Sequence, residues 1–257
     1  MYQDLFSLDG KVAVVVGGGG VLAGEMAMGL ATAGADICIA DFNAEAAAAR
    51  AELVRGLGRR ALVSQADASK RADLERTLSS AISEFGRVDI LINAAGINSG
   101  TPFFEISEDE WHRLLDVDLK SVFLGCQIFG KAMVEAGRGG SIINISSVSS
   151  GPPLSRVFTY SVAKGGVNQI TQFLAREWAP QKVRVNAIVP GFFPAEQNRK
   201  ILTPERVGQI MNHTPMGRFG EASELVGAVI YLAAERASSF VTGSILKVDG
   251  GFCAMTI

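Results

Sequence analysis

Lys11-Val-Ala-Val-Val-Val16 is a run of apolar, mostly β-branched residues, followed at once by four glycines, Gly17 to Gly20. Such a run predicts a strand that is buried on both faces of a parallel sheet. A stretch rich in Ala, Met and Leu then predicts a helix that begins near Ala23. Strand, glycine loop and helix in this order are typical of a dinucleotide-binding unit, because glycine lets backbone N–H groups approach a pyrophosphate. We therefore expect an α/β protein; the alternative interpretation of the glycines is a flexible turn.

The length and composition of the chain fit one globular α/β domain. It has 257 residues, of which 48% are hydrophobic and 19% charged, so it can bury a large core. The net charge of -2 gives no reason to expect a nucleic-acid or membrane partner. Three cysteines far apart in the chain form no metal-binding spacing and fit a reducing compartment. Because we see neither a secretory signal nor a bilayer-spanning run, we predict a cytoplasmic protein without a metal.

Asp41 lies at the end of a second predicted strand, 24 residues after Gly17. An acidic residue near this distance from the glycine loop typically binds the adenosine ribose. Its carboxylate accepts hydrogen bonds from the ribose hydroxyls and repels a 2′-phosphate, so Asp41 favours NAD over NADP as the cofactor. The alternative interpretation is an N-cap for the helix predicted from Ala44 to Leu57.

Tyr160 and Lys164 lie four residues apart in Tyr160-Ser-Val-Ala-Lys164, at the start of a helix predicted to reach about Ala179. This spacing places the phenol and the ammonium on one helical face, where the cation favours the phenolate and prepares Tyr160 for proton exchange. Ser147 follows an apolar run, at the carboxyl end of a predicted strand, where open α/β sheets bind ligands. There it could donate a hydrogen bond to a substrate oxygen. The alternatives are a turn serine and a Tyr–Lys pair on a solvated helix face.

Together, Ser147, Tyr160 and Lys164 resemble the short-chain dehydrogenase/reductase family, and the resemblance covers about Leu5 to Gly251. It implies a single Rossmann-like, doubly wound domain over residues 1–257, with a mostly parallel seven-stranded sheet and a small substrate lid at about 192–215. It also implies a homotetramer that transfers hydride between NAD and a secondary alcohol or its ketone. Tyr160 would then exchange the hydroxyl proton, Lys164 would bind the nicotinamide ribose, and Ser147 would orient the reacting oxygen.

The resemblance also assigns contact residues. Those expected to bind the cofactor are Gly17, Gly20, Val21, Leu22, Asp41, Asp67, Ala68, Asn93, Ala94, Gly96, Tyr160, Lys164, Pro190, Gly191 and Phe193. Those expected to bind the substrate are Asn98, Ser149, Gln197, Asn198 and Arg199. For Asp67 the alternative is a helix cap.

The glycine loop departs from the family pattern. Val21 and Ala23 stand where the family has its two later glycines, and Gly20 and Gly24 could offset this by a local shift. We therefore expect the fold to be kept while individual phosphate contacts differ from the family's.

Two site positions also depart from the family pattern. Asp118 replaces an active-site asparagine that holds a water linked to the lysine, and we expect Asp118 to join this proton relay or to be only structural. Ala195 replaces a threonine of the nicotinamide-covering loop, so backbone groups near Phe193 are expected to serve instead.

The segments 190–199 and 213–220 resemble the family branch that acts on sugar acids, the mannonate/fructuronate oxidoreductases and gluconate dehydrogenases. A guanidinium binds a carboxylate through two hydrogen bonds, so Arg199 is the expected partner of the acid. The alternative is that Arg199 pairs with Glu196 or Glu205 on the surface. A ketoacyl or steroid reductase, and a cofactor-binding sensor without turnover, remain the alternative functions.

Overall fold

The sheet places the carboxyl ends of seven strands at one edge of the molecule. The computed structural model describes residues 4–193 and 203–255. The strand order is β3-β2-β1-β4-β5-β6-β7, and every pairing of neighbours is parallel. The strands are β1 (Val12–Val16), β2 (Asp36–Asp41), β3 (Ala61–Gln65), β4 (Ile90–Asn93), β5 (Gly140–Ile145), β6 (Val183–Pro190) and β7 (Ile245–Val248). This confirms the predicted Rossmann-like, doubly wound sheet.

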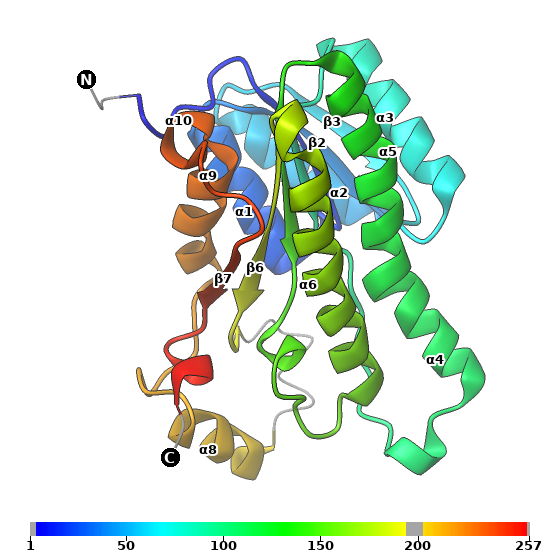
Figure 1. Cartoon of the computed structure of the whole chain (residues 1–257), viewed down its shortest axis with the longest axis vertical. Helices are drawn as coiled ribbons and strands as arrows, with labels where there is room; N and C mark the ends of the chain where they lie inside the picture. The colour runs from blue at the N-terminus through cyan, green and yellow to red at the C-terminus, as the bar shows by residue number, and fades with distance from the viewer. Residues whose placement is uncertain (1–3, 194–202, 256–257) are drawn as a thin grey trace.

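Helices cover both faces of the sheet (Figure 1). The α-helices are α1 (Val21–Thr32), α2 (Ala44–Gly56), α3 (Arg71–Phe85), α4 (Glu108–Leu115), α5 (Ser121–Ala136), α6 (Phe158–Trp178), α8 (Pro204–Asn212), α9 (Val226–Ala233) and α10 (Glu235–Ser238). Short turns of helix are η1 (Phe103–Glu105), η2 (Asp116–Lys120), η3 (Val148–Ser150), η4 (Ala179–Gln181), η5 (Ala222–Leu225) and η6 (Phe252–Ala254).

The alternation of side chains along β1 divides the core into two layers. Ala13 and Val15 pack with α1, α2 and α9 on one face of the sheet. Val12, Val14 and Val16 pack with α3, α5 and α6 on the other face. Both faces of β1 are therefore buried, as the apolar run predicted.

Several helix ends differ slightly from the prediction, for local reasons. α1 begins at Val21 rather than near Ala23, because Gly20 has extended backbone (φ -68°, ψ 163°) and acts as the N-cap. The helix predicted from Tyr160 to about Ala179 begins two residues earlier and is α6 (Phe158–Trp178). None of the helices within the described ranges combines the length and apolarity that crossing a lipid bilayer requires.

The strand order changes direction between β1 and β4, which lie side by side in the middle of the sheet. In open α/β sheets, the crevice at the carboxyl ends beside such a switch binds ligands. In Figure 1, β6 ends in the lower half of the view, on the same side as α8. The loops at this edge form the candidate site.

Candidate active site

The glycine loop between β1 and α1 is shaped to bring its backbone close to a ligand. Gly17 has a φ of 83°, in the left-handed region that favours glycine, and a Cβ on it would lie 2.7 Å from the backbone nitrogen of Ala95. Gly20 makes no side-chain cap, and the first turn of α1 holds no acidic residue. The first N–H groups of α1 are therefore open to an anion, and the loop fits a pyrophosphate.

Asp41 is fixed against this loop at the end of β2. Its Oδ2 accepts from the Gly19 N–H (2.9 Å), and its Oδ1 accepts from the Asn43 N–H (2.8 Å). The N-cap of α2 is Asn43, whose side chain accepts from the Ala46 N–H (3.0 Å). The capping role considered for Asp41 thus belongs to Asn43, and the Asp41 carboxylate lies beside the loop that fits a dinucleotide.

Ser147 and Tyr160 line one cavity of about 260 Å³ at the carboxyl ends of the strands. Its walls come from α1, the segment after β4, the end of β5, the loop before α6, α6 itself, the end of β6, α8 and the segment after α8. The lining residues are Leu22, Asn98, Ser99, Gly100, Ile145, Ser146, Ser147, Val148, Leu154, Ser155, Arg156, Val157, Tyr160, Pro190, Gly191, Phe192, Phe193, Arg206 and Phe219. Two side chains that carry hydroxyls therefore line the same cavity, as a proton-transfer site requires.

Ser149 supports Ser147 instead of lining this cavity. Its N–H and its hydroxyl both donate to the Ser147 Oγ, at 3.2 and 3.1 Å. Ser149 is only 1% exposed. The structure therefore places Ser149 as a support of the Ser147 hydroxyl inside η3, and its direct contact with the substrate stays a prediction.

Lys164 is buried next to Tyr160 and is held by two oxygen atoms. Its Nζ donates to the carbonyl oxygen of Ile145 (3.1 Å) and lies 3.5 Å from Oδ1 of Asp118. It lies 5.4 Å from the centroid of the Tyr160 ring. The helix spacing has therefore placed the cation beside the phenol, one turn along α6.

Asp118 is buried in η2, a π-helical turn between α4 and α5. The Ile97 N–H donates to both of its carboxylate oxygens, at 3.2 and 3.3 Å. Burial raises the pKa of Asp118 to about 6, although Lys164 and the Ile97 N–H act in the opposite direction. Single π-helical turns inside helices are frequent at functional sites. Asp118 is thus placed for the relay, while its part in proton transfer stays a prediction.

The segment after β4 brings backbone close to this ion pair. A Cβ on Gly96 would lie 2.8 Å from Oδ1 of Asp118, so only glycine fits there without a shift. Asn93 is buried, and its Nδ2 donates to Oδ1 of Asn144 (2.9 Å), which ties β4 to β5. Contacts from Asn93, Ala94 or Gly96 to the cofactor stay predictions.

The other predicted contact residues divide into three groups. Leu22, Asn98, Pro190, Gly191 and Phe193 line the cavity. Asp67 accepts from the N–H and hydroxyl of Ser69, at 3.0 and 2.6 Å, in the turn before α3, whose N-cap is Lys70 rather than Asp67. Gln197, Asn198 and Arg199 lie outside the described residues, as do Ala195, where the family's threonine contact is lost, and part of the predicted lid.

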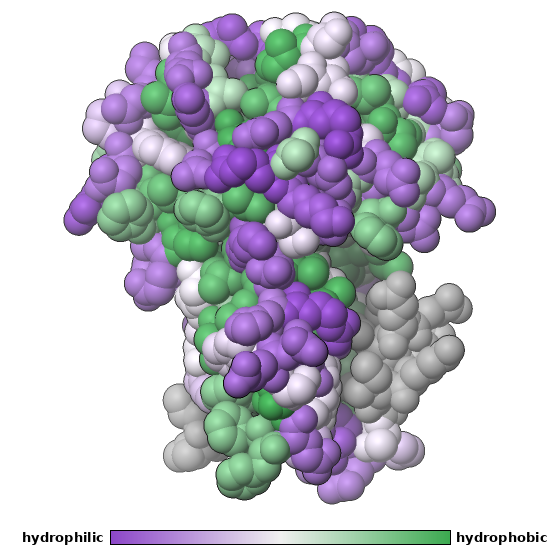
Figure 2. Space-filling model, turned by 90° about the vertical axis from the view of Figure 1, so that its right-hand side faces the viewer, coloured by the Kyte–Doolittle hydropathy of each residue, from purple (hydrophilic) through white to green (hydrophobic). Residues whose placement is uncertain are grey.

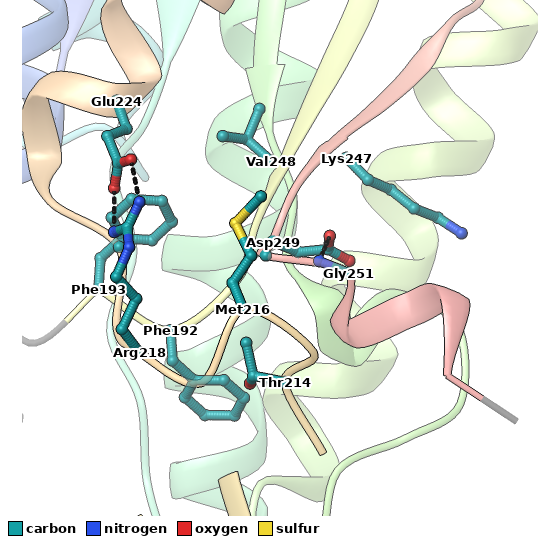
Figure 3. A pocket seen from close by; sticks show the side chains of 12 residues that line it. Phe192, Phe193, Thr214, Met216, Arg218, Glu224, Lys247, Val248, Asp249 and Gly251 are labelled. Carbon is teal, nitrogen blue, oxygen red and sulfur yellow. Dashed lines mark hydrogen bonds and ion pairs between the residues drawn. The ribbon is translucent and has the colours of Figure 1, made fainter. Parts of the chain in front are cut away.

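A second cavity, of about 380 Å³, lies near β7 and is also lined by Phe192 and Phe193 (Figure 3). Arg218 and Glu224 meet there through two hydrogen bonds of 2.8 and 2.6 Å. These bonds hold the pKa of Glu224 down at about 2. Because neither Ser147 nor Tyr160 is among its lining residues, the smaller cavity is the candidate active site.

Comparison with known proteins agrees with this geometry. A family model described as enoyl-(acyl carrier protein) reductase matches residues 20–253. The 2-dehydro-3-deoxy-D-gluconate 5-dehydrogenase of Escherichia coli (strain K12) is 39% identical over 255 residues, which cover 99% of this chain and 100% of that protein.

This chain belongs to the short-chain dehydrogenase/reductase family. Among solved structures, a gluconate 5-dehydrogenase from Burkholderia cenocepacia J2315 in complex with NADP and tartrate has a TM-score of 0.93 and 36% identity, and the match covers 98% of this chain and 99% of that one. A Haemophilus influenza protein provisionally assigned as a D-mannonate oxidoreductase, with bound NAD, has a TM-score of 0.92 and 33% identity, with 97% of each chain covered. This short-chain dehydrogenase is therefore an oxidoreductase that acts on CH–OH groups with a nicotinamide cofactor.

Sequence reasoning did not assign several residues that line the cavity, among them its two arginines, Arg156 and Arg206. Arg156 lies in the loop between η3 and α6, and Arg206 lies in the first turn of α8. The local sequence signal near Arg206 is the N-cap pattern at Thr203, which predicts the start of a helix. The Thr203 side chain accepts from the Arg206 N–H (3.2 Å) at the start of α8. That pattern does not say which cavity the helix reaches.

Proposed function

We propose that this short-chain dehydrogenase interconverts a secondary alcohol and a ketone on a sugar acid, such as a hexonate and its keto form, with NAD. The observation that carries the reaction is that the Ser147 hydroxyl and the Tyr160 phenol line one cavity with Lys164 buried beside them. The sugar-acid substrate is supported by relatives named for gluconate and 2-dehydro-3-deoxy-D-gluconate.

Each residue of the site has a distinct part in the proposed reaction. The bound nicotinamide cofactor supplies the hydride acceptor in oxidation and the hydride donor in reduction. Tyr160 takes the hydroxyl proton of the alcohol, and Lys164 beside it favours the phenolate form that can do so. Ser147 donates a hydrogen bond to the reacting oxygen, and Ser149 holds the Ser147 hydroxyl in place.

The preference for NAD rests on Asp41. Its carboxylate is held by the Gly19 and Asn43 N–H groups at the end of β2, where an adenosine ribose binds in this type of fold. A negative charge there repels a 2′-phosphate. Solved relatives carry NADP in one case and NAD in the other, so the choice of cofactor depends on this chain's own residues.

The substrate screen that tests this function uses matched pairs. D-gluconate, 2-dehydro-3-deoxy-D-gluconate and D-mannonate, their neutral sugar alcohols, and a ketoacyl and a steroid ketone would each be assayed with NAD(H) and NADP(H) at the nicotinamide absorbance. We expect the highest kcat/KM for a sugar acid with NAD(H). A higher value for the ketoacyl or steroid substrate would overturn the sugar-acid assignment, and no turnover with any substrate would favour a sensor.

We also propose that the protein is a homotetramer, as the family resemblance implies. Figure 2 shows apolar patches between polar ones on the face that carries α4 and α5. Phe123 on α5 and Phe173 on α6 are about half exposed, at 47% and 57%, and are candidates for an interface between subunits. Light scattering after size exclusion would measure the mass, and a monomer mass would overturn this proposal.

A further inference from the structure

The cavity that holds Ser147 and Tyr160 has a wall with two positive charges. Arg156 and Arg206 both line it, and none of the described lining residues carries a carboxylate. We call Ser155, Arg156 and Arg206 the arginine wall. Two cations in a concave site with low-dielectric walls raise the local concentration of anions.

Arg206 is held by neutral groups, and no carboxylate of the described residues forms an ion pair with it. Its Nη1 donates to the Ser155 Oγ (2.7 Å), and its Nη2 lies 3.4 Å from the Ser155 carbonyl oxygen. Within residues 4–193 and 203–255, its Nε donates to no acceptor and its guanidinium forms no ion pair. Glu205, its neighbour in sequence, accepts from Gln209 instead. A guanidinium has five N–H donors, so Arg206 keeps capacity for a further acceptor.

The second cavity provides an internal contrast. Arg218 lines that cavity, but Glu224 already accepts two hydrogen bonds from it (Figure 3). Both guanidinium groups use their Nη atoms, but the acceptor of Arg218 is a carboxylate, whereas the described acceptors of Arg206 are the neutral groups of Ser155 and Gln209. The charge of Arg218 is therefore offset by Glu224, whereas no described residue offsets the charge of Arg206, which lines the cavity of Ser147 and Tyr160.

Arg156 adds a second positive charge, from the loop between η3 and α6 whose Ser155 accepts a hydrogen bond from Arg206. It follows Ser155 directly, is exposed, and has a φ of 72°, in the left-handed region that favours glycine. Such backbone is sparsely populated for other residues and occurs at ligand clamps among other places. The loop before α6 thus carries one arginine into the cavity wall and fixes another through Ser155.

We infer that Arg206, assisted by Arg156, binds the carboxylate of the substrate while Ser147 and Tyr160 hold the reacting oxygen; this rests on the proposed sugar-acid function. A guanidinium fixed at one wall and two hydroxyls at another would select an acid that carries its carboxylate at a distance from the carbon that reacts. Arg199, the partner predicted from the sequence, is then not the main carboxylate contact.

The test measures binding separately from turnover. The protein loaded with NADH cannot oxidise an alcohol, so calorimetry of this complex gives the Kd of D-gluconate and of D-glucitol, its neutral counterpart. For Arg206→Gln we expect gluconate to bind about 10- to 100-fold more weakly, the effect of one charge-assisted hydrogen bond. The affinity for glucitol should change less than about twofold, because the substitution removes charge and keeps an amide that can bond Ser155.

Three further variants make the test specific. Arg206→Lys should recover part of the gluconate affinity, because it keeps the charge but loses the planar fork. Arg156→Gln should lower gluconate affinity by a smaller factor. Arg176→Gln is the matched control, because Arg176 lies exposed on the same helix as Tyr160 and pairs with Glu177; it should bind both compounds as the wild type does.

The outcomes separate this inference from the proposed function. If Arg206→Gln loses gluconate and glucitol affinity equally, Arg206 only holds the loop and the inference is wrong. If Arg199→Gln loses gluconate affinity and Arg206→Gln does not, the sequence prediction holds instead. If the wild type binds gluconate through Arg206 but oxidises no sugar acid, the inference stands and the proposed function fails. Failure of the wild type to bind any of D-gluconate, 2-dehydro-3-deoxy-D-gluconate and D-mannonate overturns both.

Discussion

Two parts of the same site are built in different ways. The proposed catalytic residues, which we call the catalytic group, are Asp118, Ser147, Tyr160 and Lys164. They lie at the end of β5, on α6 and in η2, and Asp118 and Lys164 are 0% and 3% exposed. The arginine wall lies on a loop and on the first turn of α8, and its arginines are exposed or half-buried.

The catalytic group and the arginine wall also differ in the groups that hold their side chains in place. Lys164 and Asp118 are each held by a backbone group, the Ile145 carbonyl and the Ile97 N–H. Arg206 is held mainly by one serine side chain. Loops that are positioned by a rigid scaffold often determine which ligand a protein binds, because loops can change without disturbing the core. Changes in the catalytic group should therefore affect every substrate alike, and changes in the arginine wall should affect acids alone.

The largest effect is expected for Tyr160→Phe, which removes the phenolic oxygen and keeps the ring. We expect kcat to fall by at least about 10²-fold, a typical contribution of acid–base catalysis, for the acid and the neutral substrate alike. Steady-state assays measure the loss, and NADH fluorescence should show cofactor binding close to that of the wild type. Turnover near the wild-type value would mean that another group exchanges the proton.

Asp41→Asn tests the predicted contact between the end of β2 and the adenosine ribose of the cofactor. The ratio of kcat/KM with NADP to that with NAD should rise by about 10-fold, because the variant loses the charge that repels a 2′-phosphate but keeps an acceptor for backbone N–H groups. Glu52→Gln on α2, a residue paired with Arg55, is the control and should leave the ratio unchanged. A wild type that already prefers NADP would contradict our interpretation of Asp41.

Asp118→Asn should shift the pH dependence of alcohol oxidation. The pKa of Asp118 is raised to about 6 by burial, so above this pH its carboxylate offsets the charge of Lys164. The amide leaves that charge intact, which favours the Tyr160 phenolate, so the acidic limb of the kcat/KM profile should move to lower pH. The gain should be about 3- to 10-fold near pH 7.

The sign of this shift follows from the protonation of Asp118. Well below pH 6 the wild-type carboxyl is protonated and neutral, so wild type and variant should converge. A profile that moves to higher pH, or a gain that persists at low pH, would show that Asp118 acts in another way, for example as a proton carrier in the relay. Gluconate and glucitol should shift together, because the change lies in the catalytic group.

The smallest effect is expected for Ser155→Ala, in the arginine wall. It removes the Oγ that accepts from Nη1 of Arg206 and keeps the backbone carbonyl. We expect kcat/KM for the acid to fall by about two- to fivefold, the range of one neutral hydrogen bond, with little change for the neutral alcohol. Equal losses on both substrates would remove the distinction between the two parts of the site.

The sequence by itself determined the sheet and much of the catalytic group. The apolar, mostly β-branched run at Val12–Val16 and the glycines after it predicted a buried strand of an α/β protein, and the family resemblance added the doubly wound sheet. Tyr160 and Lys164 are one turn apart in any helix, so their approach required no knowledge of the fold. Asp41 was found because a strand end beside a glycine loop has a fixed place in such folds.

Only the tertiary structure decided how these parts meet and what charge they face. Asp118 approaches Lys164 because a π-helical turn and the Ile97 N–H place it there, and its pKa depends on burial that no local pattern encodes. Arg206 reaches Ser155 across 51 positions of the chain. The physical reason is that desolvation and charge pairing depend on every neighbour in space, whereas periodicity and spacing report only neighbours along the chain.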